Sequence, residues 1–378
     1  MIDGRQLSEN AKKGSLRALA LCPFPIASAS TRFRLDQFRE PLEARGIELE
    51  ISPFLSDDDF QTFYQKRNLV PRLVGMLAGV LRRLAGILKA RHFDVLIVQR
   101  EAMMFGPAFF EGLYALVGRI PMILDLDDAT YVRYVSPTYG RSASLFKSFD
   151  KTDKLISRAS IVVCGNPYIA KYVEQKGCET AVIPTVADLD VFRPQENRSD
   201  EIQVVGWIGT HSTYPFLERI LPVLQELAKR HRFSLKVVGS GRSTIDFGGD
   251  VEILPWELDR EVDDFRSLDI GLYPIMVTES ASEEWILGKS GFKAIQYMAV
   301  GVPFVMSPVG VCADLGVAGE THFNATTDED WYNSLNELLS DPNRRMRMGA
   351  RARAYAEENF GVEKHADMLA NAVRRVCR

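Results

Sequence analysis

A basic loop containing two glycines precedes a short helical pattern, and it reads Gly-Lys-Ser-Gly-Phe-Lys from Gly288. Free backbone amides at the start of a helix, with the helix dipole behind them, bind anions. The segment therefore predicts a binding site for a diphosphate. An ordinary glycine loop with solvated lysines would explain the same letters. The residues of the predicted site are Lys289, Ser290, Gly291, Phe292 and Lys293.

Gln296 follows this loop by about one helical turn, and its amide could hydrogen-bond a ribose. The triplet that begins at Gly288 is not a P-loop, because Glu283 stands where the Walker A motif requires glycine. ATP hydrolysis is therefore disfavoured.

Small, polar and aromatic residues follow several strand-like runs in the second half of the chain. Gly209 and His211 come after the run 202–208, and His211 could contact a diphosphate or a sugar. Trp256 follows the run 251–254 and either stacks on a nucleotide base or belongs to the core. The predicted contacts to the base come from Gly239, Trp256 and Pro274.

The first strand-like run, Leu16–Cys22, leads into the small residues of Ala-Ser-Ala-Ser-Thr-Arg. Such residues allow a ligand to approach the backbone closely, and the helix after them offers a second anion site. Arg32 or Arg34 could pair with a phosphate there. A plain Ser/Thr helix cap with solvated arginines is the alternative. The residues of this second predicted site are Ser30, Thr31 and Arg32.

Asp127 and Asp128 follow the run Met122–Leu126, at the strand end where α/β enzymes place their ligands. We expect these carboxylates to bind hydroxyl groups of a sugar or an acceptor. Acid/base catalysis or a metal pair is a sharper alternative, and capping of the next helix is a simpler one. The five cysteines show no metal-ligand spacing, so no metal and no cofactor are expected.

The elements that must position these residues alternate along the chain. Short β-branched runs are separated by helical patterns, which predicts an α/β fold with parallel sheets whose ligands lie beyond the carboxyl ends of the strands. The predicted strands are Leu16–Cys22, Gly46–Ile51, Asp94–Gln99, Pro121–Leu126, Ser160–Cys164, Thr180–Ile183, Ile202–Ile208, Leu235–Val238, Val251–Leu254, Ile270–Tyr273 and Val302–Met306. Two helices are expected from Asp341 onward.

A chain of 378 residues with 46% hydrophobic and 25% charged residues is globular and suits two domains. The polar run Gln-Glu-Asn-Arg-Ser-Asp-Glu marks the boundary between them. We predict a polar tail at 1–15, a Rossmann-like acceptor domain at 16–195 and a Rossmann-like donor domain at 196–355. A final helix at 356–378 is expected to pack back on the first domain.

A net charge of −4 gives no general attraction to nucleic acid, and none is expected as a partner. The odd number of cysteines and the polar N-terminal stretch suit the cytoplasm, and no run is long enough to span a membrane. Residues 66–92 carry seven Lys or Arg and no acid around an apolar run. They form either a basic amphipathic helix on an anionic membrane or buried helices with a basic solvent edge.

The second half of the chain resembles the retaining family 4 glycosyltransferases of GT-B fold. The similar segments are Met298-Ala-Val-Gly-Val-Pro303, Val237-Val-Gly-Ser-Gly241, Leu268-Asp-Ile-Gly-Leu-Tyr-Pro274, the Arg345–Arg353 stretch, and Ala187–Pro194, which resembles the linker between the domains. The resemblance implies two Rossmann-like domains whose sheets face a central cleft, with C-terminal helices closing the fold. It implies a nucleotide-sugar donor, a role in polysaccharide biosynthesis, retention of configuration, and no protein nucleophile.

The chain departs from this family at both glutamates of the Glu-x7-Glu motif, where Gly288 and Gln296 stand. Gln296 can keep the ribose contact of the second glutamate, whereas Gly288 cannot replace a carboxylate. The arginine and lysine that neutralise the diphosphate in the family are also not evident after the run 202–208. A subgroup with the pattern Gly-Lys-x-Gly-Phe-Lys-x-x-Gln-Tyr-Met-Ala is more similar to this chain.

The combined interpretation is a cytoplasmic hexosyltransferase, which residues 66–92 would make peripheral on the inner face of the membrane if they bind anionic lipid. It would transfer a sugar from a UDP- or GDP-sugar to a hydroxyl of a glycan or a lipid-linked glycan. A non-catalytic nucleotide-sugar-binding or scaffold protein and a GT-B-like nucleotide-sugar epimerase are the alternatives, the first because of the two missing glutamates.

Overall fold

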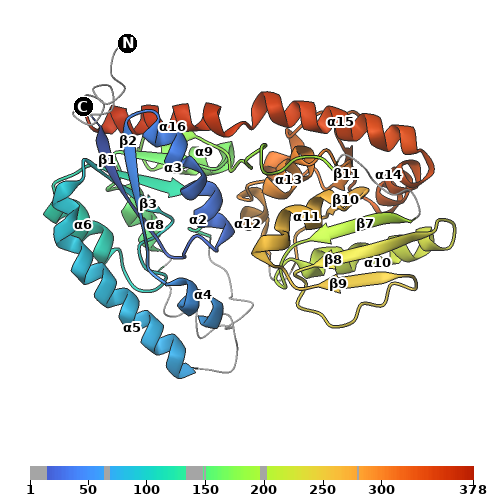
Figure 1. Cartoon of the computed structure of the whole chain (residues 1–378), viewed down its shortest axis with the longest axis horizontal. Coiled ribbons are helices and arrows are strands. Elements are labelled where there is room, and N and C mark those ends of the chain that lie inside the picture. Colours follow the sequence, from blue (N-terminus) through green and yellow to red (C-terminus); the bar gives the residue numbers. More distant parts are fainter. Residues whose placement is uncertain (1–14, 64–68, 133–147, 149, 196–201, 279–280) are drawn as a thin grey trace, which may run out of the picture. The chain divides into compact units, whose positions relative to one another are not determined.

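The computed structural model of the chain describes residues 15–63, 69–132, 148, 150–195, 202–278 and 281–378. It divides into two compact units. Unit 1 comprises Met1–Thr185 and Val362–Arg378, and unit 2 comprises Val186–Gly361. The chain passes from unit 1 to unit 2 somewhat before the polar run that marks the boundary in the sequence, and its last helix returns to unit 1 (Figure 1).

Unit 1 is built on a six-stranded sheet in the order β2-β1-β3-β4-β5-β6, and every neighbouring pair is parallel. The central strands read as nearly continuous apolar runs because helices cover both faces of such a sheet. The strands are β1 (Leu16–Cys22), β2 (Ile47–Pro53), β3 (Val95–Gln99), β4 (Met122–Leu126), β5 (Ile161–Cys164) and β6 (Thr180–Val182).

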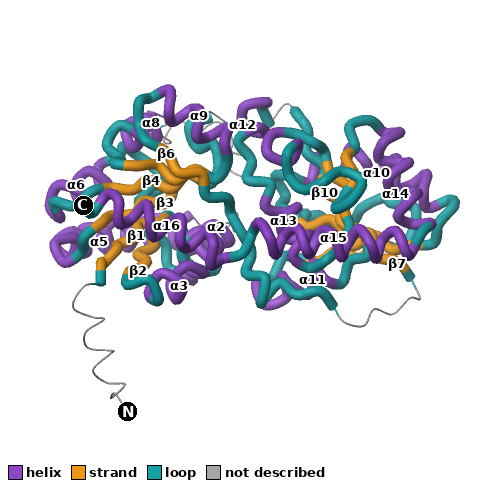
Figure 2. Tube along the Cα trace, turned by 90° about the horizontal axis from the view of Figure 1, so that it is seen from above, coloured by secondary structure: helices purple, strands orange, loops and turns teal. Residues whose placement is uncertain are grey.

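Helices flank these strands, as the purple and orange segments of Figure 2 show. The helix α9 begins at Pro167 because Asn166 caps it, its side chain accepting a hydrogen bond from the amide of Ile169 at 2.9 Å. The helices of unit 1 are α2 (Ala29–Arg34), α3 (Arg39–Glu43), α4 (Asp57–Phe63), α5 (Leu69–Gly86), α6 (Phe109–Gly118), α8 (Asp150–Ile156), α9 (Pro167–Gln175) and α16 (Val362–Val376), with 3-10 turns η2 (Asp36–Phe38) and η3 (Ile87–His92).

The C-terminal helix α16 contacts the rest of unit 1 through Arg45, which lies just after α3. Its guanidinium pairs with Glu363 at 2.9 Å and with Asp367 at 2.7 Å. In return, Arg374 donates a hydrogen bond to the backbone carbonyl of Arg45 at 2.6 Å. These contacts explain why α16 belongs to unit 1, although it follows unit 2 in the sequence.

Unit 2 repeats the architecture with a second six-stranded parallel sheet in the order β12-β11-β10-β7-β8-β9. Its strands are β7 (Gln203–Ile208), β8 (Phe233–Val238), β9 (Val251–Leu254), β10 (Ile270–Tyr273), β11 (Phe304–Met306) and β12 (Phe323–Asn324). Its helices are α10 (Tyr214–Ala228), α11 (Glu261–Arg266), α12 (Glu283–Leu287), α13 (Phe292–Ala299), α14 (Asp328–Ser340) and α15 (Pro342–Asn359), with η4 (Leu258–Arg260) and η5 (Gly310–Ala313).

The predicted fold class is confirmed in each unit, and the two helices expected from Asp341 onward are α15 and α16. Each sheet has its own apolar core, formed by the strands and the helices packed on them. Among the described residues, no helix combines the length and the apolar character needed to cross a membrane.

Candidate functional site

The carboxyl edge of the unit 2 sheet brings together three loops that follow β7, β8 and β9. The amide of Gly209 donates to the carbonyl of Val238 at 3.0 Å, and the amide of Gly239 donates to that of Leu254 at 2.9 Å. A Cβ on Gly239 would lie 2.3 Å from the carbonyl oxygen of Gly209 and 3.5 Å from Cβ of Trp256. The two glycines and the half-buried Trp256, predicted separately from the sequence, therefore form one locus.

His211 lies at the same edge, where the loops after β7 and β8 meet. A Cβ on Gly241, which has φ +68°, would lie 3.2 Å from Cβ of His211. β7 has β8 on one side and β10 on the other, so the loops after β7 and β10 flank the point where the strand order reverses. Ligands of open α/β sheets bind at this point. Pro274 follows β10 and is buried there.

Arg242 is a basic residue at this edge that the sequence interpretation missed. Its guanidinium lies 4.9 Å from the centre of the ring of Tyr214, the first residue of α10, and its side chain is exposed. It therefore stands beside the start of a fifteen-residue helix. Its place directly after the run Val238-Gly-Ser-Gly241 was the available signal, because loops after strands gather at one edge.

The basic loop before α13 also belongs to the carboxyl edge of this sheet. The short helix α12 before it is capped by Ser282, whose hydroxyl accepts a hydrogen bond from the amide of Trp285 at 3.3 Å. Lys289 then folds back so that Nζ lies 3.3 Å from the centre of the Trp285 ring, and Ser290 beside it is half-buried. Gly288, at the position of the missing glutamate, is buried at the end of α12.

Gly291 makes this loop possible because it adopts φ +66°, a backbone conformation that favours glycine. A Cβ there would lie 2.9 Å from Cγ1 of Val311 in η5, the turn that follows β11. Phe292, half-buried, then begins α13. The close packing on η5 places the predicted diphosphate loop at the end of β11.

Lys293 and Gln296 form a pair on α13. Lys293 Nζ donates to Oε1 of Gln296 at 3.2 Å and lies 5.1 Å from the centre of the Phe265 ring. Gln296 is fully buried, and its amide nitrogen has no hydrogen-bond partner among the described residues. Contact with a ribose would therefore require the side chain to move, and this contact remains a prediction.

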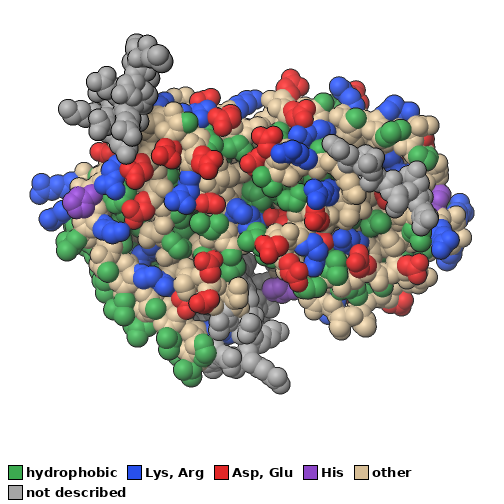
Figure 3. Space-filling model, in the orientation of Figure 1, with side chains coloured by type: hydrophobic (Ala, Val, Ile, Leu, Met, Phe, Trp, Pro, Cys, Tyr) green, Lys and Arg blue, Asp and Glu red, His purple; other side chains and the backbone are tan. Residues whose placement is uncertain are grey.

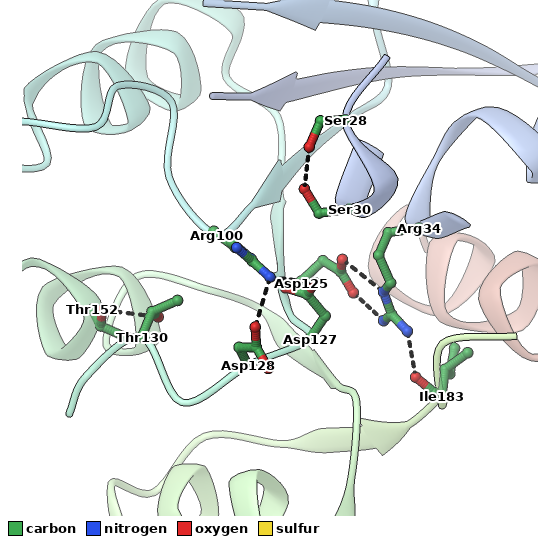
Figure 4. A network of polar contacts seen from close by, with 10 residues as sticks. All are labelled: Ser28, Ser30, Arg34, Arg100, Asp125, Asp127, Asp128, Thr130, Thr152 and Ile183. Carbon is green, nitrogen blue, oxygen red and sulfur yellow. Dashed lines mark hydrogen bonds and ion pairs between the residues drawn. The ribbon is translucent and has the colours of Figure 1, made fainter. Parts of the chain in front are cut away.

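In unit 1, Asp127 and Asp128 are both bound by Arg100, which follows β3 (Figure 4). Arg100 Nε and Nη2 contact the two oxygens of Asp127 at 2.5 and 2.7 Å, and Nη2 also contacts Asp128 at 2.9 Å. Burial would raise the pKa of Asp127, but the Arg100 guanidinium outweighs it and lowers that pKa. Asp127 is therefore an ionised partner of Arg100, whereas the side chain of Asp128 is 32% exposed and can accept a hydrogen bond from a ligand.

Arg100 is the second basic residue that the sequence interpretation missed. It has φ +60°, which is uncommon for a residue with a side chain and concentrates at functional positions. Its amide donates to the carbonyl of Asp125 at 2.8 Å, which fixes the loop to β4. A basic residue directly after the run Asp94–Gln99 was the signal in the sequence.

Asp125 and Arg34 form a separate, buried ion pair beside these carboxylates (Figure 4). Arg34 Nε lies 3.1 Å from Asp125, Nη2 makes a second contact to the same carboxylate, and Nη1 donates to the carbonyl of Ile183 at 2.7 Å. Burial lowers the pKa of Arg34, but Asp125 outweighs it and raises that pKa. Arg34, one of two arginines considered for a phosphate contact, is thus engaged inside the unit instead.

The second predicted anion site, at the start of α2, is only partly presented to a ligand. Thr31 is buried and its hydroxyl donates to the carbonyl of Phe24 at 2.8 Å, so the structure assigns it a role within the loop. Arg32 Nη1 donates to the carbonyl of Ala27 at 3.2 Å, and its guanidinium lies 4.7 Å from the Phe33 ring centre. Ser30 is half-buried, with its hydroxyl 3.2 Å from that of Ser28.

Several solved structures are similar to this chain over nearly its whole length. HepE of Anabaena, solved with UDP and glucose, matches 95% of this chain and 99% of its own with a TM-score of 0.65 and 15% identity. Sucrose-phosphate synthase of Thermosynechococcus elongatus matches 96% and 99% with a TM-score of 0.66 and 14% identity.

The chain has the GT-B fold. A glycosyltransferase from Rickettsia africae shares this GT-B fold at a TM-score of 0.67 and 12% identity, over 97% of this chain and 99% of that one. At these identities the likeness establishes the fold and not the reaction.

Curated relatives in sequence are also glycosyltransferases. The chain is 35% identical over 225 residues to the D-inositol 3-phosphate glycosyltransferase of Rhodococcus jostii, which covers 51% of this chain and 46% of the relative. It is 25% identical over 224 residues to that of Corynebacterium jeikeium, covering 51% of each. The chain thus spans about half the length of the curated relatives it matches. No family model matches this GT-B chain.

Proposed function

We propose that this chain is a glycosyltransferase that takes a sugar from a nucleotide-diphosphate donor held by unit 2. The observation that carries the proposal is the convergence of Gly209, His211 and Gly239 at the strand-order reversal of the unit 2 sheet. Small residues there expose backbone to a ligand, as nucleotide-binding sheets require. The structure of HepE with UDP-glucose and the names of the curated relatives support the same assignment.

The donor diphosphate would be neutralised by side chains and by a helix start. Lys289 and Lys293 flank the start of α13, and Arg242 stands beside the start of α10. Charge-assisted hydrogen bonds from such groups are about twice as strong as neutral ones. The base would lie against Gly239, Trp256 and Pro274, and UDP is the first nucleotide to test, with GDP second.

The acceptor hydroxyl would bind to unit 1 at the carboxyl ends of β3 and β4. Asp128 offers a carboxylate there, already oriented by Arg100. Beside them lies a small polar hollow lined by Glu101, Thr130 and Lys151, among others. A glycan or a lipid-linked glycan presents hydroxyls that suit such groups. If the protein is cytoplasmic and binds an anionic membrane through residues 66–92, of which 66–68 lie outside the described residues, it would meet a lipid-linked acceptor there.

We also propose retention of configuration and transfer without a protein nucleophile, a metal or a cofactor. In this mechanism the diphosphate of the donor itself removes the proton from the acceptor hydroxyl. Lys289, Lys293 and Arg242 would then stabilise the negative charge that develops on the leaving diphosphate. Activity that persists in excess chelator is the expected result.

A non-catalytic nucleotide-sugar-binding protein is the second candidate, and one observation favours it. The position where the resembling family has its first glutamate is occupied by Gly288, which has no side chain and is buried at the end of α12. Such a protein would bind the donor as tightly but would not turn it over. An epimerase would need an acid and a base at the sugar, and Asp127 is buried in an ion pair with Arg100.

The test is calorimetric titration of the full chain with UDP, GDP and ADP, followed by incubation with UDP-glucose and GDP-mannose. We expect one nucleoside diphosphate to bind selectively. The nucleotide-sugar that contains it should be hydrolysed slowly when no acceptor is present. Selective binding without turnover, even with added glycan or lipid acceptors, favours the non-catalytic protein. Absence of binding by all three nucleotides overturns the proposal.

A further inference from the structure

The helix α5 and the turn η3 after it carry a continuous row of aliphatic side chains on their outer face. Their exposed fractions lie between 47% and 71%. Figure 3 shows hydrophobic side chains gathering over this part of unit 1. The row consists of Val70, Leu73, Val74, Leu77, Leu81, Leu84 and Leu88.

The face of α5 that packs on unit 1 carries small residues, whereas a surface helix normally places its large apolar residues there. A Cβ on Gly79 would lie 2.7 Å from the Phe54 ring, and one on Gly86 would lie 2.3 Å from the hydroxyl of Tyr114. The small residues thus let the helix sit close to the unit, while the large aliphatic residues point away from it. A surface helix places its apolar stripe toward the core, so this polarity requires another apolar environment outside.

Arg83 adds to the inversion because it is a basic residue that faces inward. It is fully buried and donates to the carbonyls of Ala102, Ser52 and Cys22 at 2.9, 2.8 and 2.8 Å. Arg83 therefore holds α5 on the unit and cannot reach a membrane. The alternative from the sequence, buried helices with a basic edge, is wrong for this face: the leucines are outside.

The length and chemistry of the row suit a bilayer surface. Val70 and Leu88 are eighteen positions apart in the sequence, which is about 27 Å if the segment is helical throughout. On α6, which packs beside η3, Phe109 and Leu116 are also exposed. Large contiguous apolar patches on monomeric soluble proteins usually mark a binding surface.

The charges around the row favour anionic lipid. From Leu69 to His92 the chain carries basic residues but no acidic one. Arg82 pairs with Asp59 at 3.0 Å and Lys89 with Glu50 at 3.4 Å, while Arg91 at the end of the row is exposed. The charge available to headgroups is thus modest, and the apolar face must supply most of the affinity.

A partner helix is the other occupant to weigh, because six of the residues from Val70 to Leu88 follow a spacing of four and three typical of a coiled-coil seam. The flanking positions of such a seam normally carry charges that select the partner. Here they are occupied by apolar residues, including Ala78, Val80 and Ala85. The row therefore lacks the polar rim of a specific protein interface, and it suits lipid better.

We propose that the outer face of α5 and η3 docks the protein on an anionic membrane by inserting its aliphatic row among the acyl chains. The charges of the segment only orient it. This inference rests on the proposed peripheral location and explains it by hydrophobic insertion instead of electrostatic attraction. It does not depend on the chemistry of unit 2.

The test is co-sedimentation of the full chain with vesicles of phosphatidylcholine, alone or with roughly one third phosphatidylglycerol. Wild type should partition onto the mixed vesicles, and Leu73→Gln/Leu77→Gln/Leu81→Gln should lower the partition coefficient at least about tenfold. Met346→Gln, an equally exposed apolar residue of unit 2, is the matched control and should change nothing. Arg82→Gln should reduce binding less than about threefold.

Insertion itself is measured with Leu77→Trp and lipids brominated on their acyl chains, which should quench the added fluorescence. Binding that needs phosphatidylglycerol but survives the triple substitution overturns the inference, as does wild type that stays in solution with both vesicles. A wild-type dimer that the triple variant converts to monomer would show that a second copy covers the row. UDP affinity, measured in parallel, should be equal in all variants, so failure of the donor proposal is seen separately.

Discussion

The ammonium group of Lys289 lies 3.3 Å from the centre of the Trp285 ring, four residues before it. The ring holds the lysine at the loop that leads into α13, so less conformational freedom is lost when an anion binds. Lys289→Ala should therefore weaken UDP or GDP binding by about 1.5–3 kcal/mol, and Lys293→Ala by a similar amount.

Calorimetric titration measures this loss. Lys229→Ala is the matched control, because Lys229 is an exposed lysine of the same unit that pairs with Glu226. Equal affinity of the Lys289→Ala variant and this control would remove Lys289 from the diphosphate site.

Gly291→Ala should destabilise unit 2 and impair nucleotide binding together. A side chain at φ +66° costs about 1–2 kcal/mol, and the new Cβ would also lie 2.9 Å from Val311. Gly319→Ala separates the two effects, since Gly319 has φ +80° but nothing within 4 Å of its Cβ. Urea unfolding should show a larger loss for Gly291→Ala, and only this variant should bind UDP more weakly. If Gly291→Ala and Gly319→Ala lose the same stability, η5 moves enough to accommodate the added methyl group.

Asp125→Ala should destabilise unit 1 by about 3–5 kcal/mol, because it leaves the Arg34 guanidinium buried without its counter-ion. The exposed pair of Arg17 and Glu48, at 3.5 Å, provides the comparison: Glu48→Ala should cost about 1 kcal/mol or less. Replacing both partners, Arg34→Met with Asp125→Leu, should recover part of the loss. Urea unfolding followed by circular dichroism measures all three, and similar values for Asp125→Ala and Glu48→Ala would contradict the prediction.

His322 should make unit 2 less stable in mild acid. Burial lowers its pKa to about 4, and its ring nitrogens face Thr321 Oγ1 at 2.8 Å and Asn324 Oδ1 at 3.0 Å. Between its usual pKa of about 6.5 and pH 4 the unfolded chain binds a proton that the folded chain does not, so stability falls as pH falls. The total loss is on the order of 3 kcal/mol at about 1.4 kcal/mol per pKa unit.

His322→Asn removes this titration, so its unfolding free energy should fall less than that of wild type between pH 7 and 4. Parallel pH profiles for the two proteins would show that His322 does not titrate in this range.

The sequence determined the strands and their order along the chain because buried parallel strands read as uninterrupted apolar runs. Val251–Leu254 and Ile270–Tyr273 were predicted at the observed bounds, and the parallel sheets followed from the alternation with helices. The two-residue strand β12 was missed, since two residues cannot show a period. The residues at the carboxyl edge of the unit 2 sheet, such as Gly209 and Gly239, could be listed from sequence because each directly follows a strand.

Only the tertiary structure decided which side chains meet and which face of a helix is outside. Nothing in the sequence separates Asp125, held by Arg34, from Asp127, held by Arg100, because one arginine lies on helix α2 and the other follows strand β3, both distant in the sequence from the carboxylates. Likewise the sequence of α5 predicts an amphipathic helix but does not show which of its faces is buried. In the structure Arg83 faces the core and Leu77 faces outward. Spacing along one helix fixes which residues share a face, whereas the packing of the neighbouring elements chooses the face that is buried.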